Sequence, residues 1–454
     1  MTAMTTAPAA FDRRLLPPML LGTVLNPVNS SMIAVALIPI GLALGASPAQ
    51  TAWLVSGLYL ATAVGQPVVG KLVDTYGPRK LYLAGAVLLG LGGLAGALAP
   101  DLWVLVIARV LIGFGTCAGY PAAMYLVRRE AERTGAKSPA GVLTALAVGA
   151  QTVAVVGPTV GGLLIGLGGW RTIFAINVPM ALLCLVLGTW RLPRTAAPRE
   201  RPRFDVIGIG LFAVSLTALL FFLMEPHVVT LWLLALTVAG GAGFAVRELR
   251  TREPFLDLRV LGGNGPLLTT YGRNLLAYAV SYAFIYGYTQ WLEAGRGLSA
   301  SHAGLILLPS FLMAIVVSTL TGRHRGVRAK LLVGAAAQIV ACALLLVVDQ
   351  GTPLVALIGL GLVVGIPQGL NNLANQNAVF HQAQADRMGQ SAGLLRTFTY
   401  LGAILASAAN GAFLGADAGT AGLHHLAIFM LGAATLMLVV IIPDRSLKLV
   451  NAQR

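Results

Sequence analysis

The sequence predicts an all-α polytopic membrane protein, and two of its properties lead to that prediction. Of its 454 residues, 57% are hydrophobic and only 10% are charged, and the mean hydropathy is +0.81. A soluble domain has roughly a quarter of its residues charged, so a soluble fold could not bury this composition. The apolar runs are also continuous over about 20 residues, which is typical of transmembrane helices and not of alternating β-barrel strands.

Fourteen segments have the length and apolar character needed to cross a bilayer as helices. The predicted spans are 17–41, 51–70, 81–99, 103–126, 140–165, 173–190, 206–224, 229–246, 267–291, 302–320, 331–348, 353–373, 390–413 and 422–442. The polar segment 1–16 precedes the first span without a convincing signal-peptide cleavage site, so we expect that span to be retained.

The basic residues predict the orientation of these spans. The segments on one side are 1–16, 71–80, 127–139, 191–205, 247–266, 321–330, 374–389 and 443–454, and they hold 26 of the 31 Lys and Arg residues. The loops on the other side hold Arg171 and Arg296. Cytoplasmic loops retain positive charge, so we expect both termini in the cytoplasm of a bacterial inner (plasma) membrane protein. The net charge of +15 is explained by this topology, and no nucleic-acid partner is predicted.

The sequence offers no motif for an enzyme or a cofactor. Cys117, Cys184 and Cys342 all lie inside apolar runs and form no Cys-x-x-Cys pair, so we expect buried thiols instead of disulfides or metal ligands. The chain has no P-loop, which argues against ATP-driven transport. It also has no zinc-ligand spacing and no pairing of a nucleophile with a base.

The segment between spans two and three combines turn residues with charge. It reads Gly70-Lys71-Leu72-Val73-Asp74-Thr75-Tyr76-Gly77-Pro78-Arg79-Lys80, in which Gly77-Pro78 is a turn signal. The order Gly-Lys-x-x-Asp-x-x-Gly-x-Arg-Lys resembles the signature loop of the major facilitator superfamily. The resemblance implies that Asp74, Lys71, Gly77 and Arg79 gate the cytoplasmic side by latching two halves together. The alternative is loop charge that serves only orientation.

Spans four and five carry further parts of the resemblance. Ala108-Arg109-Val110-Leu111-Ile112-Gly113-Phe114-Gly115 is similar to the family's Arg-x-x-x-Gly-x-Gly motif, and Gly157-Pro158 resembles the motif of its exporter branch. Phe204-Asp205 and Glu253-Pro254-Phe255-Leu256-Asp257 are similar to segments of the fourteen-helix drug/proton antiporters, which include tetracycline- and multidrug-type exporters. We expect Gly157 and Pro158 to soften span five or to allow close packing there.

A weak internal repeat predicts how the chain is divided. The segment Gly322-Arg323-His324-Arg325-Gly326-Val327-Arg328-Ala329-Lys330 resembles the loop around Gly77 in spacing, with Arg323 near the position of Asp74. Such repeats indicate homologous halves. We expect a major facilitator fold with six-helix halves at 1–190 and 267–454. Segment 191–266 would add a linker, two inserted helices and an amphipathic stretch at 247–261.

Arg109 is the most informative candidate binding residue. A cation in mid-span is costly and indicates a functional site. Its expected partners lie on span one, at Asn26, Asn29 and Ser30, and Gln151 on span five is a further candidate. Drug/proton antiporters carry an acid in span one, whereas none of the 16 acids here lies in the middle of a span. If protons drive transport, the carboxylate must lie near a membrane face, with Asp74, Glu225, Glu293 and Asp349 as candidates.

The second half supplies the remaining candidates. In span nine Asn274, Tyr278, Tyr282, Tyr286 and Gln290 recur every four residues and share one face, where they could stack on a substrate or only pack between helices. Span twelve ends with Gln368, Asn371, Asn372, Asn375, Gln376 and Asn377, and Arg396 enters span thirteen at a similar depth. We expect Arg273 to extend to the membrane interface, and Arg396, which lies deeper, to bind substrate.

The predicted function is secondary export of small amphipathic organic compounds, such as drugs, antibiotics or secondary metabolites. The halves would alternate around a midplane cavity, with proton antiport, in a monomer. The first alternative is an exporter or exchanger of an anionic metabolite, in which Arg109 and Arg396 are counter-charges. A second alternative is a membrane receptor or scaffold that does not transport.

Overall fold

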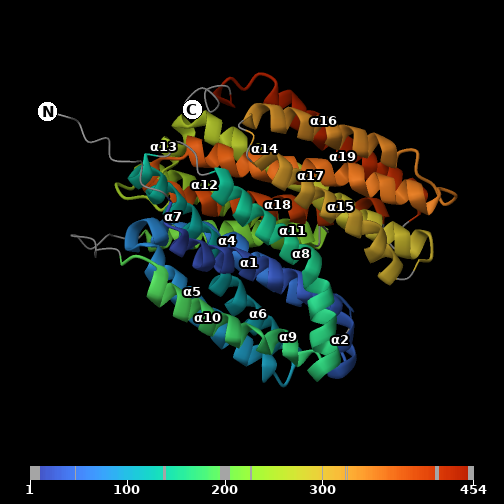
Figure 1. Cartoon of the computed structure of the whole chain (residues 1–454), viewed down its shortest axis with the longest axis horizontal. Coiled ribbons are helices and arrows are strands. Elements are labelled where there is room, and N and C mark those ends of the chain that lie inside the picture. The colour runs from blue at the N-terminus through green and yellow to red at the C-terminus, as the bar shows by residue number, and fades with distance from the viewer. Residues whose placement is uncertain are drawn as a thin grey trace. The chain divides into compact units, whose positions relative to one another are not determined.

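The computed structural model describes residues 11–46, 48–135, 140–194, 205–224, 228–298, 300–322, 324, 326–414 and 419–447. Within these ranges every regular element is a helix (Figure 1). Glu225, Phe204 and Arg323 lie outside the described residues, as do parts of the predicted segments 1–16, 127–139, 191–205 and 443–454.

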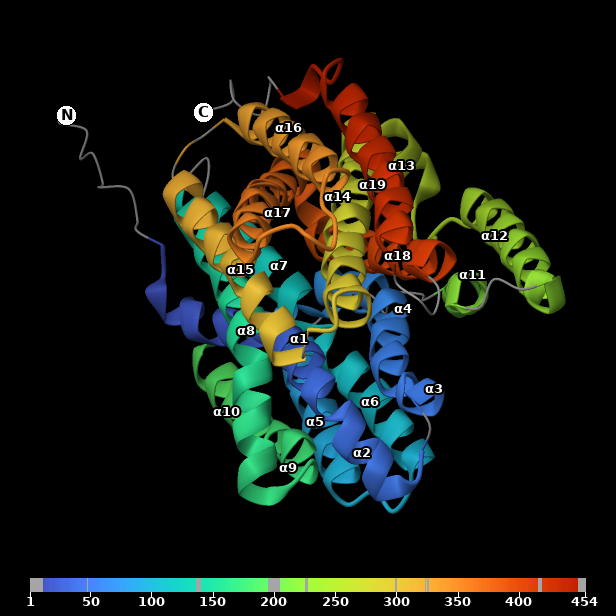
Figure 2. The ribbon, with the colours of Figure 1, turned by 90° about the vertical axis from the view of Figure 1, so that its right-hand side faces the viewer.

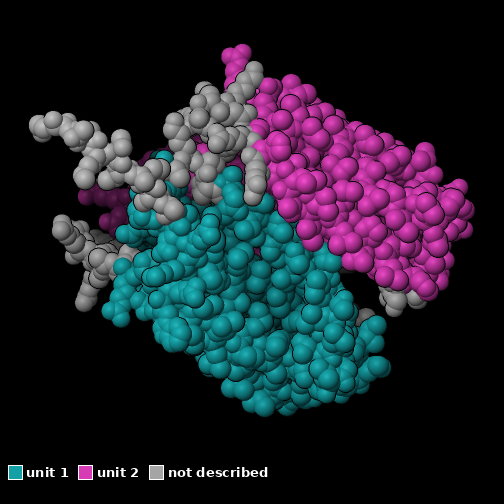
Figure 3. Space-filling view, in the orientation of Figure 1, with its two compact units in different colours: residues 1–202, 383–393, 452–454 teal, residues 203–382, 394–451 magenta. Residues whose placement is uncertain are grey.

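The chain forms two compact units (Figure 3). Unit 1 contains residues 1–202, 383–393 and 452–454, and unit 2 contains residues 203–382 and 394–451. Helix α18 (Met388–Leu414) therefore begins in unit 1 and continues in unit 2 from Leu394 onward. The boundaries predicted at 190 and 266 stay a prediction.

Unit 1 is a bundle in which glycines allow backbones to approach closely. Its helices are α1 (Leu16–Met32), α2 (Leu37–Leu44), α3 (Pro48–Thr51), α4 (Trp53–Tyr76), α5 (Pro78–Ala97), α6 (Leu102–Thr116), α7 (Gly119–Thr134), α8 (Ala140–Gly168), α9 (Arg171–Ala175) and α10 (Asn177–Arg191). Helix α1 packs on α8, while α5 packs on α6 and α10. A Cβ on Gly119 of α7 would lie 2.0 Å from the carbonyl oxygen of Gly22 in α1. Small residues at such crossings are the usual means of packing helices in lipid.

Unit 2 contains a second bundle and a helical pair. Its helices are α11 (Val206–Met224), α12 (Leu231–Arg250), α13 (Leu258–Gly263), α14 (Gly265–Gln290), α15 (Ala300–Gly322), α16 (Val327–Leu345), α17 (Leu354–Gln382), most of α18 and α19 (Thr420–Ile441). Helix α17 packs between α15 and α16, which lie on either side of it (Figure 2). Helices α11 and α12 pair with each other. A short π-helix, Trp291–Gly295, ends α14.

The helices are long and apolar enough for a multi-pass membrane protein. Among the described residues, twelve helical segments satisfy the length and hydropathy expected of a span, and a thirteenth span results if Arg13–Val35 and Leu37–Leu44, bent by 58°, count as one. Helix α14 has 26 residues but includes Arg273, Asn274 and several tyrosines, and it is not among the twelve. The predicted count of fourteen is therefore not confirmed.

Candidate functional site

Arg109 is completely enclosed in unit 1. Its side chain is 1% exposed, and α6 directs it toward α4 and α1. Its Nε donates to the carbonyl oxygen of Leu54 (2.8 Å), and its Nη1 donates to the carbonyl oxygen of Asn29 (3.1 Å). Its Nη2 has no hydrogen-bond partner among the described residues. Backbone carbonyl dipoles therefore stabilise the buried guanidinium, while its Nη2 donor lacks an acceptor among the described residues.

The contact predicted between Arg109 and span one exists, but it uses the backbone of Asn29. The Asn29 side chain instead donates to Oδ1 of Asn177 (2.8 Å) and to the carbonyl oxygen of Leu25 (3.0 Å). Asn26 donates to Oγ1 of Thr116 (3.2 Å). Asn177, which is fully buried, was not among the site residues predicted from the sequence. The sequence feature that could have identified it is the presence of an asparagine inside an apolar run.

Gly157 marks a close crossing of α8 with α1. A Cβ at this position would lie 1.8 Å from Oγ of Ser31, so only glycine fits. Pro158 lies inside α8, which continues without a break from Ala140 to Gly168. Gln151, two turns earlier, has a buried Oε1 with no hydrogen-bond partner among the described residues. Close packing is therefore visible at Gly157, while softening of the helix stays a prediction.

Asp74 caps the beginning of α18. Its two carboxylate oxygens accept hydrogen bonds from the backbone N–H groups of Gly389 (2.7 Å) and Gln390 (2.8 Å), within unit 1. The first N–H groups of a helix have no partner inside the helix and carry partial positive charge, so a carboxylate is well suited to them.

The other predicted gating residues lie on α4, at its end and at the start of α5. Lys71 lies one turn before Asp74 in α4, and Gly77 ends that helix with a φ of +89°. Arg79 donates to the carbonyl oxygen of Thr189 (2.8 Å). Asp74 therefore binds a helix N-terminus, whereas Arg79 binds a backbone carbonyl oxygen of α10, and the predicted charge cluster stays a prediction.

Tyrosines form a ladder along α14 of unit 2. The ring centroids of Tyr278 and Tyr282 are 5.9 Å apart, and those of Tyr282 and Tyr286 are 5.5 Å apart. All three side chains are half-buried. The face away from this tyrosine ladder carries Phe284 and Tyr288, which are buried and stacked. The regular spacing therefore distinguishes a core face from a partly open face.

Amides of α17 continue this polar region. Asn371 and Asn375 are 3% and 0% exposed, and Asn372 accepts a hydrogen bond from Gln376 (2.7 Å). Gln368, one turn earlier, has a buried Nε2 with no hydrogen-bond partner among the described residues. Arg396 is half-buried on α18. Several predicted candidates thus cluster in unit 2 on α14, α17 and α18.

Comparisons with known proteins agree with this architecture. A sequence profile described as Major Facilitator Superfamily matches residues 19–407. The chain belongs to the major facilitator superfamily. An uncharacterized transporter of the same type from Bacillus subtilis, YwoD, is 34% identical over 438 residues, which are 92% of this chain and 94% of the relative.

One further sequence relative and one solved structure complete the comparison. The tetracenomycin C resistance and export protein of Streptomyces glaucescens is 32% identical over 310 residues, which cover 66% of this chain and 56% of that protein. Among solved structures, the human organic anion transporter MFSD10 has a TM-score of 0.68, covers 95% of this chain and all of its own, and is 14% identical. At that identity the likeness shows the fold alone. This chain is therefore a multi-pass membrane transporter of the superfamily.

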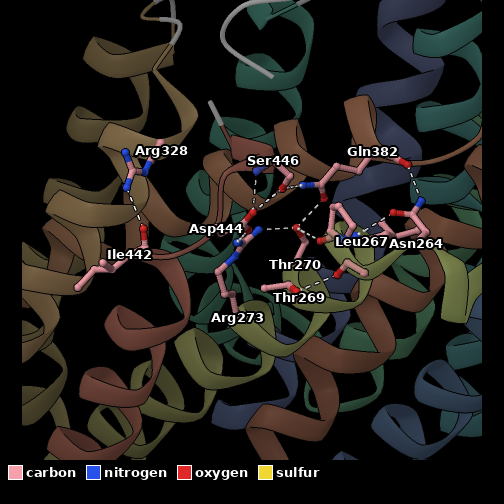
Figure 4. A network of polar contacts seen from close by, with 12 residues as sticks. Asn264, Leu267, Thr269, Thr270, Arg273, Arg328, Gln382, Ile442, Asp444 and Ser446 are labelled. Carbon is pink, nitrogen blue, oxygen red and sulfur yellow. Dashed lines mark hydrogen bonds and ion pairs between the residues drawn. The ribbon is translucent and has the colours of Figure 1, made fainter. Parts of the chain in front are cut away.

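The transporter's second intramembrane cation, Arg273, differs from our expectation. We expected it to extend to the membrane interface, but its side chain is fully buried and forms an ion pair with Asp444, which follows α19 (Figure 4). Its Nη2 also donates to Oγ1 of Thr270 (2.5 Å). That prediction was wrong because the sequence did not show that a distant carboxylate meets this turn of α14.

The candidate proton carriers are dispersed. Asp349 accepts a hydrogen bond from Thr352 (2.9 Å) in a turn after α16, and Glu293 lies in the π-helix that ends α14. Asp74 is the described candidate whose two carboxylate oxygens bind the start of another helix. Among the described residues no group of three His, Cys, Asp or Glu side chains could hold a metal ion.

Proposed function

We propose that this transporter exports small amphipathic organic compounds that contain a planar aromatic group. The observation that carries the proposal is the tyrosine ladder of Tyr278, Tyr282 and Tyr286, which repeats over three turns of α14 and stays partly open. Stacked aromatic rings with hydroxyl tips suit a ligand that has an apolar face and a polar edge. The relative from Streptomyces that exports an antibiotic supports the same class of activity.

The mechanism that we propose is alternating access with proton antiport, in the fourteen-helix drug/proton antiporter branch. The protein would act as a monomer in the bacterial inner membrane, with both termini in the cytoplasm. Within this proposal Asp74 is the gating carboxylate. Its hydrogen bonds to Gly389 and Gln390 would form in one state and break in the other, because a helix N-terminus can release a carboxylate that water then solvates.

Transport into inverted vesicles tests the proposal. A fluorescent planar dye, dihydroxyanthraquinone, should accumulate when a pH gradient, acidic inside, is imposed, and a protonophore should release it. The variant Tyr282→Leu keeps an apolar side chain but removes the middle of the ladder, and it should lower uptake roughly tenfold. Tyr125→Leu, on α7 of unit 1, is the control for loss of a tyrosine. Uptake by Tyr282→Leu equal to that of the parent protein would refute the role of the ladder, and uptake insensitive to the protonophore would refute antiport.

A second candidate is export or exchange of an anionic metabolite. Arg109 favours it, because its Nη2 is buried without a hydrogen-bond partner among the described residues and would gain from an anion. A carboxylated anthraquinone and its amide separate the two candidates, since they share a ring and differ in charge. Tighter binding of the carboxylate than of the amide that disappears in Arg109→Gln would favour the anionic substrate, and equal binding of both compounds by the parent protein would exclude it.

A further inference from the structure

Asn177 binds the residue of α1 that meets Arg109. The side chain of Asn29 donates from Nδ2 to Oδ1 of Asn177 (2.8 Å), and the backbone carbonyl oxygen of Asn29 accepts from Nη1 of Arg109 (3.1 Å). Asn29 therefore contacts α10 through its side chain and α6 through its backbone. These two hydrogen bonds connect α10, α1 and α6 inside unit 1.

Backbone carbonyls fix the direction of the Asn177 amide. Asn177 is the first residue of α10, and its Nδ2 donates to the carbonyl oxygens of Ile173 and Phe174 in α9 (3.2 Å each). A carbonyl accepts hydrogen bonds and cannot donate them, so the amide nitrogen must face α9 and the amide oxygen must face Asn29. Both hydrogens of the nitrogen are used in this way, and Oδ1 remains as the acceptor for α1.

The stretch of α1 that carries Asn29 is interrupted at both ends. Pro27 lies inside α1 and has no N–H, so the carbonyl of Thr23 lacks the hydrogen bond that it would normally accept. After Val35 the helical axis turns by 58°. Residues 28–35 therefore lie between two points at which the helix can bend, and contacts with neighbouring helices must determine their position.

Glycine packing does not by itself fix this stretch. Gly157 of α8 lies against Ser31, and such a contact lets helices approach closely but has no preferred direction. Among the described residues, the Asn29 side chain has one partner on another helix, which is Asn177. A hydrogen bond depends on distance and angle, whereas hydrogen bonds between helices in a membrane add only modestly to stability. The bond between Asn29 and Asn177 is therefore better suited to position α1 than to stabilise unit 1.

Arg109 is the group that depends on this position. Its Nε donates to the carbonyl oxygen of Leu54 in α4 and its Nη1 to that of Asn29. The guanidinium is planar, so the two hydrogen bonds together fix its plane, and a shift of the Asn29 carbonyl would release one of them. We infer that Asn177 is a positioning residue for transport, which acts on Arg109 through Asn29. The inference rests on the proposed export activity and extends it to a residue of α10.

Uptake of the dihydroxyanthraquinone dye into inverted vesicles tests the inference. Asn177→Leu and Asn29→Leu nearly retain the shape of the side chain but remove the amide. At matched amounts of folded protein, each should lower the maximal uptake rate roughly tenfold and leave KM unchanged, because a misplaced Arg109 slows the cycle without removing a contact to the dye. A purely structural role would reduce the amount of folded protein and leave the rate per folded molecule unchanged.

A double variant and a control locate the effect. Asn29→Leu/Asn177→Leu should be no slower than either single variant, because both substitutions break the same hydrogen bond. The control is Thr62→Val on α4, which removes a buried hydroxyl that donates to the carbonyl oxygens of Leu58 and Tyr59 in its own helix (2.9 Å each). It should transport as the parent protein does.

Spin labels measure the position of α1 without a substrate. They are attached at Ile38→Cys on α2 and Ile107→Cys on α6, in a background without the native cysteines, and both positions are exposed. The distribution of distances between the labels, measured by pulsed electron paramagnetic resonance, should broaden in Asn177→Leu and Asn29→Leu alike. It should stay as in the parent protein in Thr62→Val.

The outcomes separate the inference from the proposed function. No uptake of the dye by the parent protein would remove the proposed function, and the role of Asn177 in it. Uptake by the parent protein with an unchanged rate in both single variants would overturn the inference alone. An unchanged distance distribution, or a double variant much slower than either single variant, would also overturn it. If one single variant does not fold, the other carries the test, since each breaks the same hydrogen bond.

Discussion

At the scale of single residues, two buried arginines of the transporter are stabilised in different ways. Among the described residues, Arg109 donates only to backbone carbonyl oxygens, whereas Arg273 has the carboxylate of Asp444. A charge removed from water is costly unless it is paired and hydrogen-bonded. The arrangement at Arg273 is therefore typical of a structural ion pair, and the arrangement at Arg109 is typical of a functional site.

Arg109 should be essential for export. Arg109→Ala removes the guanidinium, and Arg109→Lys should not restore transport, because an ammonium group cannot direct separate donors at the carbonyls of Leu54 and Asn29. The measurement is uptake into inverted vesicles at matched expression. Arg128→Ala, which removes an exposed i,i+4 pair with Glu132, should transport as the parent protein does. Normal uptake by Arg109→Ala would contradict the prediction.

The Arg273–Asp444 pair should affect stability instead. Asp444→Asn leaves a fully buried cation without its counter-charge, which costs about 3–5 kcal/mol. The double variant Arg273→Met/Asp444→Leu should recover much of that loss, because an apolar pair needs no compensation. Thermal unfolding in detergent measures both effects. A double variant as unstable as Asp444→Asn would show that the lost charge is not the cause.

At the scale of the elements, the contact between α4 and α18 best shows what the sequence could predict. The loop around Asp74, its turn residues and the helices on either side were all recognisable from local patterns. The partner of Asp74 was not, because Gly389 is 315 residues away and contributes only a backbone N–H. The same limit explains Arg273, whose partner Asp444 is 171 residues distant. Local sequence predicts where a polar group lies, while long-range packing determines what it meets.

Close approach of α4 to the beginning of α18 requires glycine. A Cβ on Gly389 would lie 2.7 Å from both Oδ1 of Asp74 and the carbonyl oxygen of Gly70. Gly389→Ala should therefore separate the two helices and reduce transport as Asp74→Asn does, since both weaken the same hydrogen bonds. The readout is the accessibility of a cysteine, placed at the end of α4 that follows Asp74, to a membrane-impermeant thiol reagent. It is measured in a background without the native cysteines.

The control for this substitution is Gly141→Ala, where a Cβ would meet nothing within 4 Å. It should change neither transport nor accessibility, and it should stabilise α8 slightly, because alanine favours a helix over glycine by about 1 kcal/mol. If Gly389→Ala left the accessibility of α4 unchanged while Asp74→Asn raised it, the close backbone contact would not be part of the gate.

At the scale of the whole molecule, the sequence predicted the all-helical major facilitator fold correctly. Continuous apolar runs and a signature loop were sufficient for that, because lipid forces each span to satisfy its own backbone hydrogen bonds. The number of spans was harder, since α14 combines span length with polar residues. The candidate residues on α14 and α17 were predictable by residue type, but the partners of Asn274 and Gln338 are backbone carbonyl oxygens of other helices, which local sequence does not indicate.

The distribution of basic residues predicts that both termini face the cytoplasm. An epitope tag at either end should react with antibody in inverted vesicles and be protected in intact spheroplasts. A tag in the loop between α5 and α6, near Asp101, should show the opposite behaviour. Protection of only one terminal tag in spheroplasts would mean an odd number of spans, and it would contradict the orientation.

The division of α18 between the units also has a consequence for biosynthesis. Residues 1–202 leave the ribosome long before residues 383–393, yet the same compact unit contains both segments. Until the later segment has been synthesised, Asp74 lacks the N–H groups of Gly389 and Gln390. Gly70 of α4 likewise lacks the start of α18, which packs against it. We therefore expect the first half of the nascent protein to stay incompletely packed until residues 383–393 have been synthesised.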